Sequence, residues 1–123
     1  DNFSVTILGC GSAKPTVRHN PSAQLVCLNS KSFLIDCGEG TQTQLMRAHC
    51  KFNRLRHIFI SHLHGDHCYG LPGLLSTMGL TGLDGETVIH LPEEGLRLFQ
   101  PLLHYSAHDL NQLIQPYDNG NYI

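Results

Sequence analysis

The chain has 123 residues, of which 41% are hydrophobic and 15% are charged, and its formal net charge is −2. This composition is typical of one folded domain and excludes a disordered tail. No apolar run reaches the ~18 residues that a membrane-spanning helix needs, and no signal peptide is apparent, so we expect no membrane association.

Hydrophobic periodicity predicts strands that alternate with helices. The expected strands are residues 4–9, 23–28, 32–38, 57–61 and 87–91. The expected helices are residues 40–50, 70–80 and 92–106. This order predicts an α/β chain in which helices cover the outer face of a mixed sheet.

Charge is divided unevenly along the chain. Residues 1–56 contain seven Lys or Arg against three Asp or Glu, whereas residues 57–123 contain one against seven. A basic segment can contact a polyanion, but the isoelectric point near 6.5 is far below that of strong nucleic-acid binders. Charge alone therefore favours solvated surfaces.

The five cysteines are odd in number and show no Cys-x-x-Cys spacing. This pattern argues against a secreted disulfide framework and predicts a reduced, cytoplasmic protein. Cys68, beside His67, is a candidate soft metal ligand, but a buried apolar role is the preferred interpretation.

The segment ISHLHGDH, residues 60–67, places three histidines and an aspartate within six positions after a predicted strand. His62 and His64, two residues apart on extended chain, face the same side, and Gly65 lets the backbone turn back toward Asp66 and His67. Imidazole and carboxylate ligands suit Zn²⁺, and also Mn²⁺ or Fe²⁺. The sequence therefore predicts a metal site, and two such ions form the usual clamp for displacement at phosphorus.

The other histidines carry weaker signals. Isolated histidines are usually ordinary hydrogen-bonded residues, and we expect this of His49, His57 and His90. His104 and His108 are four residues apart and can ligate from one helical face, but partial exposure is the preferred interpretation.

Four segments carry a resemblance to a known family. HLHGDH, residues 62–67, resembles the HxHxDH motif of the metallo-β-lactamase fold, an αββα sandwich with a dinuclear metal site. FLIDCGEGTQTQL, residues 33–45, and LGCGSAKPTVRHNPSAQLV, residues 8–26, are similar to segments of the ribonuclease Z (tRNase Z) branch. The continuation GLPGLL, residues 70–75, matches the same branch.

The resemblance implies a zinc-dependent endoribonuclease that removes the 3′ trailer from precursor tRNA. By residue, His62 and His64 bind the first zinc, and Asp66 and His67 bind the second. Asp66 is also the family's proposed catalytic proton acceptor, and Asp36 orients the histidine loop. The resemblance further implies a cytoplasmic homodimer whose substrate is RNA and not DNA.

The chain also departs from the family pattern. His19 follows Arg18 where the pattern has Arg directly before Asn, which leaves the RNA contact of that loop open. The family's further ligands and its substrate-binding arm have no counterpart before Ile123. We therefore expect residues 1–123 to be the N-terminal half of a metallo-β-lactamase domain that is inactive alone, binds zinc weakly and exposes an apolar sheet face.

Two alternatives remain open at this point. One is another hydrolase of the same fold, namely a phosphodiesterase, an arylsulfatase or a thioesterase. The other is a non-catalytic module in which the histidine cluster holds one structural metal ion.

Overall fold

The computed structural model of the chain describes residues 3–10, 21–63, 65–80, 87–95, 97–99 and 114–117. Within these residues, six strands form one sheet in the order β1-β2-β3-β4-β5-β6. The strands are β1 (Phe3–Gly9), β2 (Ala23–Leu28), β3 (Lys31–Ile35), β4 (Leu55–Phe59), β5 (Val88–Pro92) and β6 (Ile114–Tyr117). The first two pairings are antiparallel and the other three are parallel. The predicted mixed sheet is therefore confirmed.

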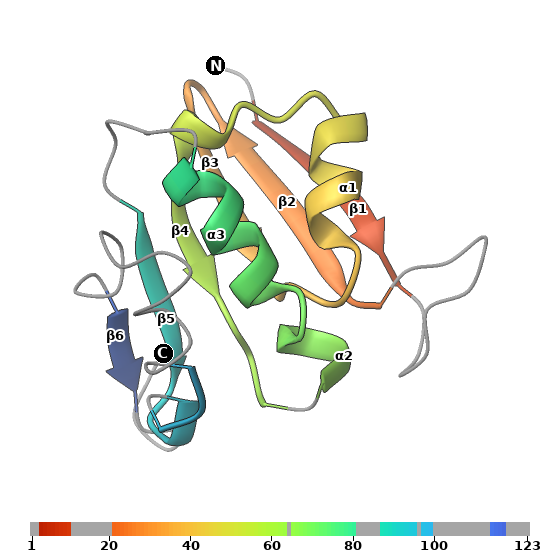
Figure 1. Cartoon of the computed structure of the whole chain (residues 1–123). Coiled ribbons are helices and arrows are strands. Elements are labelled where there is room, and N and C mark those ends of the chain that lie inside the picture. The colour runs from red at the N-terminus through yellow and green to blue at the C-terminus, as the bar shows by residue number, and fades with distance from the viewer. Residues whose placement is uncertain are drawn as a thin grey trace.

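Helices cover one face of this sheet, as the sequence predicts (Figure 1). They are α1 (Thr41–Arg47), the short α2 (Gly65–Cys68) and α3 (Leu71–Leu80), with one 3₁₀ turn, η1 (Phe52–Arg54). Residues 94–95 and 97–99 are also helical, inside the expected helix over 92–106. None of the helices in the described residues is long and apolar enough to cross a membrane.

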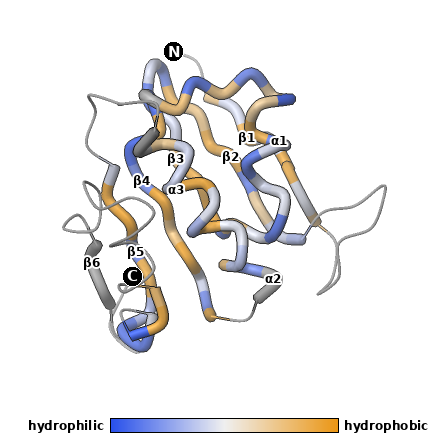
Figure 2. Tube along the Cα trace, in the orientation of Figure 1, coloured by the Kyte–Doolittle hydropathy of each residue, from blue (hydrophilic) through white to orange (hydrophobic). Residues whose placement is uncertain are grey.

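The core lies between α1, α3 and the sheet. Leu34, Ile58 and Ile89 sit side by side on β3, β4 and β5, and none is exposed. Burying each such side chain stabilises the fold by about 1.5–3 kcal/mol. Figure 2 shows most of β5 as hydrophobic, as expected for a central parallel strand. From the helices, the buried partners are Leu45, Leu71, Leu74, Leu75 and Met78.

Apolar residues also occupy the other face of the sheet. Phe3, Val5 and Ile7 alternate along β1 and are 67%, 53% and 58% exposed. The register places Phe3 beside Leu28, which is itself exposed. The expected exposed apolar sheet surface is therefore present on these residues.

Several element boundaries differ from the sequence prediction. The strand expected over 32–38 ends at Ile35, because Asp36 takes a left-handed φ of 64° and leaves the extended conformation. The strand expected over 57–61 spans Leu55–Phe59. The helix expected over 40–50 ends at Arg47, and His49 is left-handed with φ 59°. Strand β6 was not predicted, because IQPY offers little alternation and contains a proline.

Candidate active site

The candidate site lies where β3 and β4 end. These strands are parallel, so their carboxyl ends meet at the same edge of the sheet. Asp36 follows β3, and the histidine segment follows β4. The Asp36 backbone N–H donates to the Phe59 carbonyl over 2.6 Å, which ties the two strand ends together. The parallel pairing thus brings residues 25 to 31 positions apart within hydrogen-bonding reach.

Asp36 is the centre of the contacts at this edge, and it is only 4% exposed. The Ser61 backbone N–H donates to its Oδ1 over 2.8 Å, and the Ser61 hydroxyl donates to its Oδ2 over 3.0 Å. The Ser22 hydroxyl lies 3.5 Å from the same Oδ2. Asp36 therefore orients the start of the histidine segment, in agreement with the role that the resemblance implies.

The same carboxylate holds a histidine of the HxHxDH segment. His67 Nδ1 lies 2.6 Å from Asp36 Oδ2. The His67 carbonyl also accepts a 2.8 Å hydrogen bond from the Cys37 backbone N–H. Side chain and backbone of His67 are thus both fixed by the turn that follows β3.

His62 joins this group from the loop after β4. Its Nδ1 lies 3.0 Å from the Ser61 hydroxyl oxygen. The rings of His62 and His67 have centroids 3.8 Å apart and are tilted by 45°. The structure therefore brings these two predicted ligands together. His64 lies outside the described residues, and Asp66 is described only as part of α2, without its side chain.

Gly70 lets the residues that follow the histidine segment approach the turn after β3 closely. A Cβ on Gly70 would lie 2.1 Å from the carbonyl oxygen of Gly38, a separation that atoms do not tolerate. The Gly70 N–H donates to the Cys37 carbonyl over 2.8 Å. Thr41 closes the turn, because its hydroxyl donates a 2.6 Å hydrogen bond to the Gly38 carbonyl. The preceding residue, Gly40, has a positive φ of 87°. The sequence segments DCGEGT and GDHCYG therefore pack as one unit.

The chemistry of these side chains fits a divalent metal ion. A metal-ligating histidine typically donates its second ring N–H to a carboxylate or carbonyl, which orients the ring. His67 has this arrangement with Asp36. Across the described part of the chain, no group of three or more His, Cys, Asp or Glu side chains gathers as a metal site. The ligand assignment of all four residues remains a prediction.

Sequence reasoning did not single out the two serines of this site. Ser61 contacts Asp36 and His62, and Ser22 contacts Asp36. The position of Ser61, directly before His62 at a strand end, was the available signal. For Ser22 no local signal exists, because its contact with Asp36 spans 14 residues. The predictions for Arg18 and His19 fall on residues 11–20, which lie outside the described residues.

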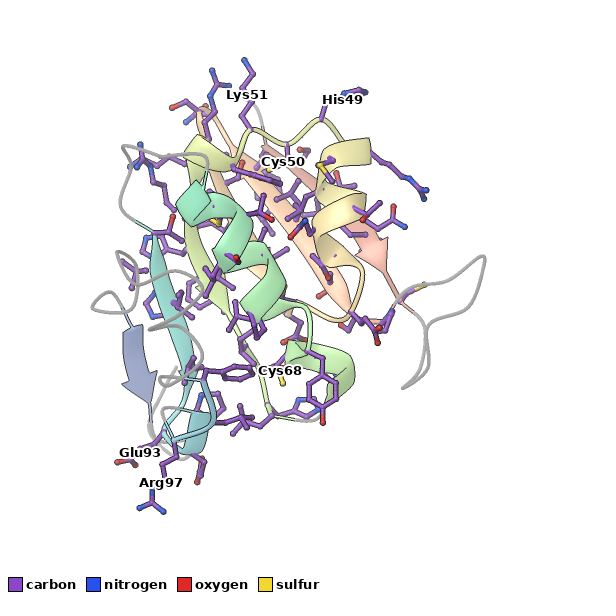
Figure 3. The ribbon with its side chains drawn as sticks, in the orientation of Figure 1. His49, Cys50, Lys51, Cys68, Glu93 and Arg97 are labelled. Atoms are coloured by element: carbon purple, nitrogen blue, oxygen red, sulfur yellow. The ribbon has the colours of Figure 1, made fainter. Side chains whose placement is uncertain are left out.

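His57 and His90 are hydrogen-bonded to each other, as expected of ordinary histidines. His57 Nδ1 and His90 Nε2 are 3.0 Å apart on neighbouring strands, and burial together with His57 lowers the pKa of His90. Cys68 is fully buried, which favours its apolar role. Figure 3 shows His49 and Lys51 at the opposite end of the molecule from Cys68. His104 and His108 lie outside the described residues.

Burial also governs the chemistry of two other thiols. The fully buried Cys37 has a pKa raised to about 12 by desolvation, and Cys50 has a pKa raised to about 11 for the same reason. Both thiols are therefore protonated at neutral pH, when they are weak nucleophiles and weak metal ligands. Neither is a candidate ligand.

Comparison with known proteins places the chain in a family. A family model described as Anti-Pycsar protein Apyc1 matches residues 3–112. The ribonuclease Z of Parabacteroides distasonis is 59% identical over 102 residues, which are 83% of this chain and 34% of that protein. The ribonuclease Z of Phocaeicola vulgatus is 49% identical over 122 residues, which are 98% of this chain and 40% of that protein. The chain thus spans a third to two fifths of the length of these two relatives.

Solved structures agree on the fold. The short form of human tRNase Z is 37% identical, with a TM-score of 0.76 over 91% of this chain and 43% of that chain. A metallo-β-lactamase fold protein, YhfI from Bacillus subtilis, is 23% identical with a TM-score of 0.72, which shows the fold alone. The fold predicted from the sequence is therefore confirmed, and the family implies metal ions. The chain belongs to the family described as Anti-Pycsar protein Apyc1, and its similarity to proteins named ribonuclease Z extends over most of its length.

Proposed function

We propose that the whole protein is a metal-dependent endoribonuclease that hydrolyses precursor tRNA and removes its 3′ trailer. The observation that carries this proposal is the joint fixing of His62 and His67 around Asp36, at the segment that resembles the ribonuclease Z motif. The identity of 49–59% to proteins named ribonuclease Z supports the same activity. Water adds across one P–O bond, which leaves a 3′-hydroxyl on the tRNA and a phosphate on the trailer.

We assign roles to four residues of the HxHxDH segment. His62 and His64 would hold one zinc ion, and Asp66 and His67 would hold the second. When bound, such cations supply Lewis-acid activation of the phosphodiester and of water. Asp66 would accept the proton that water releases, and Asp36 holds His67 in place from behind.

Four protein ligands are too few for two catalytic ions. A catalytic zinc normally receives three protein ligands, so two ions call for residues beyond these four. We therefore propose that residues 1–123 form the N-terminal part of the metallo-β-lactamase domain, and that this part alone binds zinc weakly and is inactive. We also propose a cytoplasmic homodimer, with precursor tRNA as the partner and no binding to DNA or membranes.

The test is a cleavage assay with the whole protein on precursor tRNA labelled in its 3′ trailer. His67→Ala should lower the rate by at least about 100-fold, because it removes a ligand and exposes the carboxylate behind it. His49→Ala is the matched control, since this exposed histidine lies at the far end of the fold. A wild-type rate for His67→Ala would contradict the proposal.

The second candidate is another hydrolase of the same fold, acting as a phosphodiesterase, an arylsulfatase or a thioesterase. The observation that favours it is the family description, which names a protein other than ribonuclease Z. Bis-p-nitrophenyl phosphate in the same assay separates the two candidates, because a phosphodiesterase of this kind cleaves it and leaves precursor tRNA intact. A single tightly bound metal ion per chain, with no turnover of either substrate, would instead indicate a structural metal module.

A further inference from the structure

The contacts around Asp36 restrict where protons lie on two histidines. A carboxylate accepts hydrogen bonds and does not donate them. His67 Nδ1 lies 2.6 Å from Asp36 Oδ2, so Nδ1 must carry the proton of that contact. In the neutral ring the other nitrogen, Nε2, then bears the lone pair.

The same reasoning extends to His62 through Ser61. The Ser61 hydroxyl has one proton and lies 3.0 Å from Asp36 Oδ2 and 3.0 Å from His62 Nδ1. It also lies 3.5 Å from His67 Nδ1, but the proton of that nitrogen points to the nearer Asp36 Oδ2 at 2.6 Å. If it gave its proton to His62, two oxygen acceptors would face each other over 3.0 Å without a proton between them. The hydroxyl therefore donates to Asp36, and its oxygen accepts from the Nδ1–H of His62.

The geometry points to Ser61 as a positioning residue, and we propose that it sets the tautomer of His62 by relaying the charge of Asp36. One carboxylate then places both His62 and His67 in the Nδ1–H form, which presents Nε2 of each ring as the unprotonated nitrogen. A metal ion binds a neutral imidazole only through such a nitrogen. The importance of this relay for metal binding rests on the proposed function, whereas the tautomer assignment does not.

Local structure makes the relay rigid. The Ser61 backbone N–H holds Asp36 Oδ1 at 2.8 Å, so the carboxylate cannot rotate away from the hydroxyl without losing a second hydrogen bond. The backbone of Asp36, which has a left-handed φ of 64°, is held by its hydrogen bond to Phe59. Ser61 is thus clamped at both its backbone and its side chain.

The test is long-range ¹H–¹⁵N spectroscopy of the histidine rings in the metal-free whole protein at pH 8. The rings are assigned by the loss of one signal in His62→Gln and in His67→Gln. The relay predicts the Nδ1–H tautomer for both rings in the wild type. A wild-type His62 with its proton on Nε2 would overturn the proposal without recourse to any variant.

Variants of Ser61 separate the relay from simple packing. Ser61→Ala should shift His62 toward the Nε2–H form and leave His67 unchanged, while Ser61→Thr keeps the hydroxyl and the wild-type tautomer. With Co²⁺ as the probe metal and a competing chelator, Ser61→Ala should raise the dissociation constant about tenfold, and Ser61→Thr should restore it. Ser30→Ala, at an exposed turn between β2 and β3, is the matched control.

The outcomes distinguish this relay from the proposed nuclease. An unchanged His62 tautomer in Ser61→Ala refutes the relay even if precursor tRNA is cleaved. Conversely, a shifted tautomer with no cleavage of precursor tRNA supports the relay and refutes the nuclease.

Discussion

Replacement of Asp36 tests the centre of the site through stability and without any metal. Asp36→Ala removes the carboxylate that accepts from Ser61 N–H, Ser61 Oγ and His67 Nδ1, over 2.8, 3.0 and 2.6 Å. It also places a residue with a Cβ and no polar side chain at a φ of 64°. Asp36→Asn keeps the shape of the side chain, and asparagine tolerates the left-handed conformation.

The magnitude follows from these contacts. A hydrogen bond to a charged group contributes about 1.5–3 kcal/mol, and the lower value applies here because Ser61 is exposed. The left-handed conformation costs a further ~1 kcal/mol in alanine. We therefore expect Asp36→Ala to lower the free energy of unfolding by about 5.5 kcal/mol. Asp36→Asn, which retains one acceptor oxygen, should lower it by about 2 kcal/mol.

Equilibrium urea denaturation of the metal-free protein measures both values. Glu93→Gln is the control, because this exposed carboxylate should change the free energy of unfolding by less than about 0.5 kcal/mol. A loss below about 1 kcal/mol for Asp36→Ala would refute the reasoning. It would mean that the carboxylate does not hold the two strand ends together.

Three further predictions concern packing and protonation. In the same denaturation assay, Gly70→Ala should destabilise the fold by about 1–3 kcal/mol or more, because its Cβ would meet a backbone oxygen at 2.1 Å. Gly73→Ala lies inside α3, and its Cβ would have 3.8 Å of clearance. This control should therefore be neutral or stabilising by up to ~1 kcal/mol. Iodoacetamide at pH 8 should alkylate the exposed Cys10 and spare the buried Cys37, whose pKa is about 12. Equal labelling of the two thiols, measured by mass spectrometry, would contradict the burial of Cys37. Because folding lowers the pKa of His90, the unfolded chain takes up a proton at this residue before the folded protein does as the pH falls below about 6.5. The free energy of unfolding should therefore decline below that pH. His90→Gln should flatten this decline, and an unchanged dependence of stability on pH would exclude His90 as its source.

Much of the fold is predictable because local pattern and burial agree. The apolar runs of β4 and β5 and the helical spacing of α1 follow the rules for buried strands and amphipathic helices. The break after Ile35 was missed, because Cys37 resumes the apolar pattern after Asp36 and only the backbone reveals that Asp36 is left-handed. Strand β6 is held by its parallel pairing with β5, and its own residues carry no strand signal.

The location of the candidate site was predictable, whereas the residues that support it were less so. The density of metal-competent side chains in residues 60–67 indicated where to expect a metal site, and the rings of His62 and His67 do lie together there. Asp36 was recognised only through the resemblance. Ser61 was missed because its role depends on a contact with a residue 25 positions away, which no local pattern encodes.

Anomalous diffraction at the zinc edge from crystals of the whole protein grown with Zn²⁺ tests the central claim most directly. The account predicts anomalous peaks about 2.0–2.1 Å from Nε2 of His62 and of His67, with Nδ1 of His67 still held by Asp36. Zinc bound elsewhere, or bound through Nδ1 of His62 or His67, would contradict it.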